Sequence, residues 1–194
     1  MGMPAVEKRR WTAREVRDLI AAEPLASPRY ELVDGELLVT PSPGLRHQAV
    51  VGGLLVALHD YLAHEPVGVC VVSPSDIELE SETITQPDVY VAPRGEWKRA
   101  LTQGFPLFEL LLAIEVLSPS SGRHDRVRKR PLYLRHVPEY WIVDLDARVF
   151  ERWRAGDRRP EIVSDRLTWT PDGASTPFDL DVAAFFARAL LDED

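Results

Sequence analysis

A single glutamate interrupts the most apolar segment of the chain. Residues 107–117 read LFELLLAIEVL, and from position 110 onwards only Glu115 is polar. A run that is apolar on both faces is typical of a central β-strand buried on both sides. An ionised carboxylate in such a place is costly unless it is paired or binds a metal. Glu115 is therefore a candidate metal ligand, and a salt bridge to an arginine is the alternative.

A second carboxylate, Asp88, follows Pro87 and opens the β-rich run Val89-Tyr90-Val91. Proline is tolerated at the start of a strand, although an aspartate after a proline is more often a turn residue. Asp88 becomes a candidate site residue because Glu115 is expected on the next strand. An aspartate on one strand and a glutamate on the next can place two oxygens on one Mg²⁺, which prefers hard oxygen ligands. The two acids thus form a candidate metal site.

A β-hairpin is expected early in the chain, over residues 30–40, which read YELVDGELLVT. Asp34-Gly35 between two alternating runs is a strong signal for a two-residue turn. One face of this hairpin is apolar and should pack inward; it carries Tyr30, Leu32, Leu37 and Val39. The opposite face carries Glu31, Val33, Glu36 and Leu38. Glu31 fits a polar strand face there, while a place beside the metal site stays open as a second interpretation.

Two helices are expected around this hairpin. The first covers residues 12–22, with Thr12 as N-cap and Glu15 completing a capping box. The second, over residues 43–64, has Ser42 as candidate N-cap and Pro43 at its first position. Its buried face recurs at helical spacing through Val51, Leu54, Leu58 and Leu62. Gly52 and Gly53 in its middle suggest close packing on a sheet. His47 shares the buried face and could contact a carboxylate or a phosphate, or could simply be a core histidine.

The remaining elements complete one α/β (α+β) domain covering residues 1–194. Strands are expected over 67–74, 76–80, 88–92, 107–117, 139–145 and 148–154, with a short one near 167–170. Helices are expected over 123–136 and 181–191. This order indicates one mixed central sheet flanked by helices.

Composition restricts the class of protein. The chain has one cysteine, no apolar run long enough for a membrane helix, and a net charge of −8. We therefore expect a cytoplasmic protein. The acidic balance argues against a protein that coats nucleic acid generally. Residues 123–136 nevertheless carry six Lys or Arg and one acid, which is compatible with a local phosphate-binding face or with a solvated surface.

Several ordered motifs together resemble one known family. They are YELVDGE at 30–36, His47, Pro87-Asp88, EVLSPSS at 115–121, Asp125, Lys129, Tyr133 and EYWIVD at 139–144. This pattern resembles the Uma-type restriction endonuclease family of the PD-(D/E)XK nuclease superfamily, over about residues 30–186. The resemblance implies a restriction-endonuclease-like sheet with flanking helices and a carboxylate cluster that binds a divalent metal.

The resemblance also implies roles for single residues. Asp88 is similar to the superfamily's first acid and Glu115 to its second. The superfamily's lysine should stand at position 117, where this chain has Leu117. Lys129 matches the position from which the Uma-type pattern supplies a lysine instead. Pro131 lies two residues later and cannot donate a helical hydrogen bond. Either the helix starts near Lys129 or it kinks there, and Lys129 could also belong to a solvated basic face.

The function implied is a Mg²⁺-dependent endonuclease acting on DNA, with Mn²⁺ as a substitute. Asp88 and Glu115, with the Val116 carbonyl, would hold the metal, and Lys129 would assist the reaction. Glu31 and His47 are additional site candidates. Contacts to the nucleic-acid backbone are expected from Arg123, Arg126, Arg128 and Arg130. Family analogy suggests a homodimer. The alternative is an inactive nuclease-fold protein that binds nucleic acid or a protein partner, and RNA or branched substrates remain open.

Overall fold

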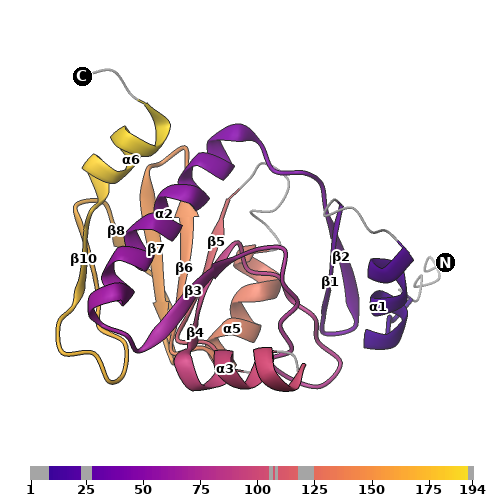
Figure 1. Ribbon diagram of the computed structural model, residues 1–194. Helices are drawn as coiled ribbons and strands as arrows, with labels where there is room; N and C mark the ends of the chain where they lie inside the picture. The colour runs from indigo at the N-terminus through magenta and orange to yellow at the C-terminus, as the bar shows by residue number, and fades with distance from the viewer. Residues whose placement is uncertain (1–8, 23–27, 105–106, 108, 118–124, 192–194) are drawn as a thin grey trace.

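The computed structural model describes residues 9–22, 28–104, 107, 109–117 and 125–191 (Figure 1). Within these residues it contains five α-helices, one π-helical turn and ten strands. In chain order they are α1 (Ala13–Ala22), β1 (Arg29–Val33), β2 (Glu36–Thr40), α2 (Leu45–His64), β3 (Gly68–Val72), β4 (Val89–Pro93), α3 (Arg94–Gln103), β5 (Leu112–Val116), η1 (Asp125–Lys129), α5 (Arg130–His136), β6 (Glu139–Asp144), β7 (Val149–Arg154), β8 (Glu161–Val163), β9 (Arg166–Trp169), β10 (Phe178–Asp181) and α6 (Val182–Leu190).

A six-stranded mixed sheet forms the centre, in the order β3-β4-β5-β6-β7-β8. Its neighbouring strands are antiparallel except for β5 and β6, which are parallel. Parallel neighbours need a crossover connection, and here the chain between them passes through η1 and α5. Two separate hairpins, β1-β2 and β9-β10, flank this sheet. The predicted mixed sheet with flanking helices and an N-terminal hairpin is confirmed.

The two faces of the sheet bury different clusters. Alternating strand residues point to opposite sides, so Val89, Ile114 and Val143 pack under α2 and α6, and Ala113 and Ile142 pack under α5. Figure 1 shows α2 crossing one face of the sheet and α5 on the other. The β1-β2 hairpin and α1 lie beside the sheet at the end away from α6. The predicted site residues come from the meeting point of the hairpin, α2, the sheet and α5.

The hairpin has the predicted turn and the predicted pairing, but two of its residues differ from the prediction in exposure. Its register pairs Leu32 with Leu37 and Glu31 with Leu38, as a two-residue turn requires. Leu32 packs against α1 as expected. Val39, predicted to face inward, is 54% exposed, and the polar-face interpretation of Glu31 is wrong, because Glu31 is fully buried. Both faces of the hairpin are covered, one by α1 and the other by the site.

The two N-terminal helices follow the sequence signals with small shifts. In α1 the capping box forms, since Glu15 accepts from the Thr12 amide at 2.9 Å. Helix α2 buries the expected face, including His47. It begins at Leu45 after Gly44, however, so Ser42 and Pro43 lie before it.

The glycine pair in α2 packs differently from the prediction. A Cβ added to Gly53 would lie 3.0 Å from the Phe185 ring of α6, and one added to Gly52 would meet open space. The close approach predicted for the sheet is therefore made by Gly53 with α6.

Other differences from the prediction concern one segment expected to be a strand, one helix and two short strands. Residues 76–80 form no strand; Ile77 makes only isolated bridges with Thr85 and Leu107. Helix α3 was not predicted, and no residue in it is buried, so no apolar periodicity marks it in the sequence. The short strands β8 and β10 were also missed. Among the described residues no helix has the length and apolar character needed to cross a membrane.

Candidate active site

The sheet brings the two predicted carboxylates together. Strands β4 and β5 are antiparallel, with Val89 opposite Ile114. Continuing this register by one residue places Asp88 opposite Glu115, on the same side of the sheet. The exposed fraction is 4% for Asp88 and 1% for Glu115. Two acids that are far apart in the sequence thus become buried neighbours at the end of β4 and within β5.

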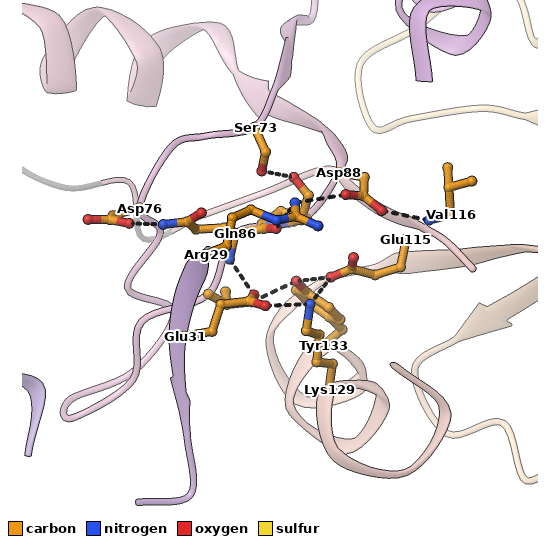
Figure 2. Close-up of polar contacts among 12 residues, drawn as sticks. Arg29, Glu31, Ser73, Asp76, Gln86, Asp88, Glu115, Val116, Lys129 and Tyr133 are labelled. Atoms are coloured by element: carbon orange, nitrogen blue, oxygen red, sulfur yellow. Dashed lines mark hydrogen bonds and ion pairs between the residues drawn. The ribbon is translucent and has the colours of Figure 1, made fainter. Parts of the chain in front are cut away.

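Asp88 accepts hydrogen bonds from three directions. Arg29 Nη1 donates to Oδ1 at 2.8 Å, and Oδ2 accepts from the Val116 amide at 2.9 Å (Figure 2). Oδ2 also lies 3.0 Å from His47 Nε2. Burial raises the pKa of Asp88, but the hydrogen bond from His47 and the charge of Arg29 outweigh it and hold the pKa well below its ordinary range. Asp88 is therefore ionised at neutral pH, and His47 is the donor in their contact.

Glu115 is held by two residues of the crossover connection. Its Oε1 accepts from Lys129 Nζ at 2.9 Å and from the Tyr133 hydroxyl at 3.0 Å. Burial, followed by the charges of Glu115 and Glu31, raises the pKa of Tyr133 well above its ordinary value, so the phenol keeps its proton and can donate. Glu115 is thus paired with a cation, as the salt-bridge alternative required, although the cation is a lysine.

Lys129 lies between two acids. Its Nζ is 2.9 Å from Glu115 Oε1 and 2.8 Å from Glu31 Oε2, and the residue is only 3% exposed (Figure 2). Helix α5 begins at Arg130 with Pro131 in its first turn, which is the first of the two arrangements that Pro131 allowed. The π-helical turn η1 precedes it and ends at Lys129. Lys129 therefore points into the site, and the solvated-face interpretation is wrong.

Glu31 belongs to the same cluster. Its Oε1 accepts from the Gln86 amide at 2.7 Å and from the Thr85 hydroxyl at 3.1 Å. Thr85 Oγ1 also lies 2.8 Å from the Tyr133 hydroxyl. Thr85 and Tyr133 have one hydroxyl proton each, so at most two of the contacts Thr85–Glu31, Thr85–Tyr133 and Tyr133–Glu115 are hydrogen bonds at one time. This network connects Glu31 to Glu115 through uncharged groups as well as through Lys129.

Leu117 stands where the family resemblance led us to look first for a lysine. It is buried in the cluster under α5, together with Leu132 and Tyr133. The lysine that reaches Glu115 is Lys129, at the end of η1.

The predicted backbone-contacting arginines already have intramolecular partners. Arg123 lies outside the described residues. Arg126 forms ion pairs with Glu151 and Asp144, and Arg128 Nη2 lies 3.0 Å from Glu36 Oε2. The Arg130 guanidinium lies 4.7 Å from the ring centroid of Trp153. Contact of these three arginines with nucleic acid would have to replace or share these interactions, and it stays a prediction.

Two site residues were not predicted. Arg29 makes the ion pair with Asp88, 59 positions away, and no local pattern marks it. Tyr133 stood in the sequence only as part of the family motif, without a role, and its hydroxyl contacts Glu115. The signal for Tyr133 was present, because residues four apart on a helix share a face and Lys129 precedes it by four.

The donor atoms suit a divalent cation, although the described residues hold no ready-made cage. Among them no group of three or more His, Cys, Asp or Glu is arranged to hold a metal. The reason is visible: Lys129 separates Glu31 from Glu115. The available donors are hard carboxylate oxygens, which Mg²⁺ and Mn²⁺ prefer. Glu31 Oε2 is buried without a hydrogen bond and meets only the Lys129 ammonium. The donor atoms are thus of the type that a divalent cation prefers, and the Lys129 ammonium occupies the space between Glu31 and Glu115.

Comparisons with known proteins concern the family and the fold of the chain. The model of the Uma2 family, described as "Putative restriction endonuclease", matches residues 16–183. A crystal structure described as "a putative nuclease belonging to DUF820 from Anabaena variabilis ATCC 29413" superposes with a TM-score of 0.72. The two chains are 19% identical, and the match covers 89% of this chain and 97% of the other. At that identity the likeness shows the fold alone. A comparison with curated proteins found no significant match.

Proposed function

The chain belongs to the Uma2 family, and from this premise we propose that it is a Mg²⁺-dependent endonuclease that hydrolyses phosphodiester bonds in DNA. Mn²⁺ should substitute for Mg²⁺. The observation that supports the proposal best is the placement of Asp88 and Glu115. Both acids are buried, Asp88 directly before β4 and Glu115 in the neighbouring strand β5, and a lysine stands within hydrogen-bond distance of Glu115.

The proposed metal ligands are Asp88 and Glu115, with the backbone carbonyl of Val116. When bound, a divalent cation lowers the pKa of a water molecule and offsets negative charge on the phosphate. Asp88 is suited to this part because it is ionised and its carboxylate is fixed by Arg29, His47 and the Val116 amide. Residues that orient a ligand in this way typically matter for metal affinity.

Lys129 has the proposed task of stabilising the negative charge that develops on the scissile phosphate. It is already buried beside both acids, so a shift of its flexible side chain towards the substrate is enough to free Glu115. Tyr133 then keeps Glu115 in position through its hydroxyl. Glu31 supplies a second acceptor for the lysine ammonium when no substrate is bound.

The test uses purified protein, supercoiled plasmid and Mn²⁺. Asp88→Asn and Glu115→Gln keep the side-chain shapes and remove the charges. Glu109→Gln is the matched control, because Glu109 is exposed. We expect wild type and the control to nick the plasmid equally, and each site variant to lose about 100-fold or more, as for other charge-stabilising groups. An Asp88→Asn protein that cleaves like wild type would refute the proposed site.

A second candidate function is favoured by one observation, the lysine lodged between Glu31 and Glu115. If Lys129 never leaves, the chain is an inactive nuclease-fold protein that binds nucleic acid or a partner. A titration with Mn²⁺ separates the two, because a cation that binds the folded state raises the melting temperature. The nuclease should gain stability in wild type and not in Glu115→Gln, whereas the inactive scaffold should gain none in either.

Oligomeric state belongs to the proposal as well. We propose a homodimer by analogy with the family, and sedimentation equilibrium of the purified chain tests it directly. A mass of one chain at assay concentrations would refute it.

A further inference from the structure

A pocket of about 270 Å³ opens beside Asp88. Three of its lining residues, Arg29, His47 and Asp88, are the residues that make the Asp88 hydrogen-bond cluster. An occupant of this pocket would therefore touch a proposed metal ligand directly. The volume is just below the usual range of small-ligand sites, about 300–1,000 Å³, and several times the roughly 30 Å³ share of one water molecule. A pocket of this volume suits a small ligand such as a single nucleotide.

The walls of the pocket are largely apolar and come from two separate segments. Pro43 and Val51 belong to the start of α2 and the residues before it, and Val72 and Pro74 belong to the end of β3 and the residues after it. Rigid apolar surfaces of this kind suit the flat faces of a nucleobase, which pockets for unstacked bases contact through stacking or apolar side chains.

Polar side chains line the same pocket between these apolar surfaces. Ser42, Gln48 and Ser73 contribute two hydroxyls and one amide. The Gln48 amide can both donate and accept, as the edge of a base requires. The pocket thus combines apolar surfaces for the faces of a base with polar groups for its edge.

Two side chains that line the pocket, Arg29 and His47, each have a nitrogen atom without a hydrogen-bond partner among the described residues. These atoms, Arg29 Nε and His47 Nδ1, are buried. Only 6% of the His47 side chain is exposed. Burying a polar atom without a partner costs free energy. Arg29 Nε is a donor and suits a sugar or phosphate oxygen, whereas His47 Nδ1, whose ring donates from Nε2 to Asp88, is an acceptor and suits an N–H group of a base. A nucleotide supplies both kinds of group.

The surrounding charges disfavour a clamp on continuous duplex. Arg46, Arg126 and Arg128 are paired with acidic side chains, and the chain carries a net charge of −8. Neutralising many duplex phosphates requires a surplus of cations, which these residues do not provide. In a continuous duplex the base would also have to leave its stack to enter the pocket, and this costs least where the base is already unpaired.

From these observations we propose that the pocket beside Asp88 binds one unpaired nucleotide next to the scissile phosphate. Single-stranded or locally unpaired DNA is then the preferred substrate of the site. The position of this nucleotide next to a scissile phosphate rests on the proposed nuclease function. The binding of an unpaired nucleotide rests on the pocket alone.

The binding test needs no catalysis. The full chain is mixed in EDTA with three fluorescently labelled DNAs of one sequence: a single strand, a continuous duplex, and a duplex with one extra unpaired 2-aminopurine. Fluorescence anisotropy measures affinity, and 2-aminopurine emission reports whether the base changes its stacking. We expect at least tenfold tighter binding of the single strand and the bulged duplex than of the continuous duplex, with a change in emission.

Two tryptophan variants on α2 locate the effect. Gln48→Trp puts a large ring at the pocket, and Val56→Trp is the control, since Val56 is 60% exposed and does not line this pocket. Both variants should melt like wild type. We expect Gln48→Trp to lose at least tenfold in affinity for the unpaired DNAs and nothing for the duplex, and Val56→Trp to lose nothing.

The outcomes separate this inference from the nuclease itself. Equal affinity for all three DNAs would refute the binding of an unpaired nucleotide in this pocket. An affinity of Gln48→Trp for the unpaired DNAs equal to that of wild type would refute it too. Cleavage of continuous duplex in preference to unpaired DNA also overturns it while leaving the nuclease intact. Discrimination in EDTA without any Mn²⁺-dependent cleavage supports the pocket and refutes the proposed function.

Discussion

Replacing Lys129 by methionine is the sharpest perturbation that the site offers. The ammonium lies 2.8 Å from Glu31 Oε2 and 2.9 Å from Glu115 Oε1 in a residue that is 3% exposed. Methionine keeps most of the side-chain volume, so little of the effect comes from an altered cavity. The change removes the positive charge and leaves two buried carboxylates facing each other.

The expected loss follows from the burial of the pair. Removing one partner of a buried ion pair typically costs about 3–5 kcal/mol of unfolding free energy, because a charge remains buried without compensation. Urea unfolding followed by circular dichroism measures this loss. Lys98→Met is the matched control, since Lys98 is exposed in α3, and such surface changes stay within about 0.5 kcal/mol.

Metal should rescue the same variant. With the ammonium gone, Glu31 and Glu115 present their oxygens to a cation, and a ligand at 100 times its dissociation constant adds about 2.7 kcal/mol of stability. Mn²⁺ should therefore stabilise Lys129→Met more than wild type, where the ammonium competes for the same oxygens. A loss below about 1 kcal/mol would refute the buried pair. A variant that gains no stability from Mn²⁺ would refute the carboxylates as a cation site.

Three further predictions concern other groups. Tyr133→Phe should lose about 1 kcal/mol in urea unfolding, the usual worth of a lost hydrogen bond, and unchanged stability would contradict the contact with Glu115. The hydroxyl of Thr176 and the amides of Ser175 and Thr176 hold the pKa of Glu65 below its ordinary 4.5. Wild type should therefore melt higher than Glu65→Gln at pH 7, with the difference shrinking as the pH falls below 4.5; a difference that grows in acid would reverse the sign of this argument. Burial raises the pKa of the Cys70 thiol to about 12, so iodoacetamide at pH 8 should alkylate it only after unfolding, as mass spectrometry would show.

Local patterns in the sequence predicted the elements that support the site. The Asp34-Gly35 turn, the capping box of Thr12 and Glu15, and the buried face of α2 are each set by residues within a few positions of one another. Glu115 stood out for the same reason, since a lone acid in an apolar strand is visible without any knowledge of its partners.

The contacts that complete the site could not be predicted in this way. The Arg29 ion pair with Asp88 and the hydrogen bond of Thr85 with Glu31 join residues 59 and 54 positions apart. Such pairs depend on how the hairpin docks against the sheet, and no periodicity of a single segment contains that information. The π-helical turn before Lys129 is similar, because it depends on how the crossover connection packs back onto β5.

The burial of Glu31 could have been predicted from the sequence of the hairpin. The supposedly polar face also carries Val33 and Leu38, and both are buried with Glu31. At least two apolar residues on each face indicate a hairpin covered on both sides, and a glutamate on a covered face needs a cation. The chain has only three lysines, and of these Lys129 alone lies in a segment that resembles the family's motif. In the structure Lys129 is that cation, and its single ammonium pairs with both Glu31 and Glu115.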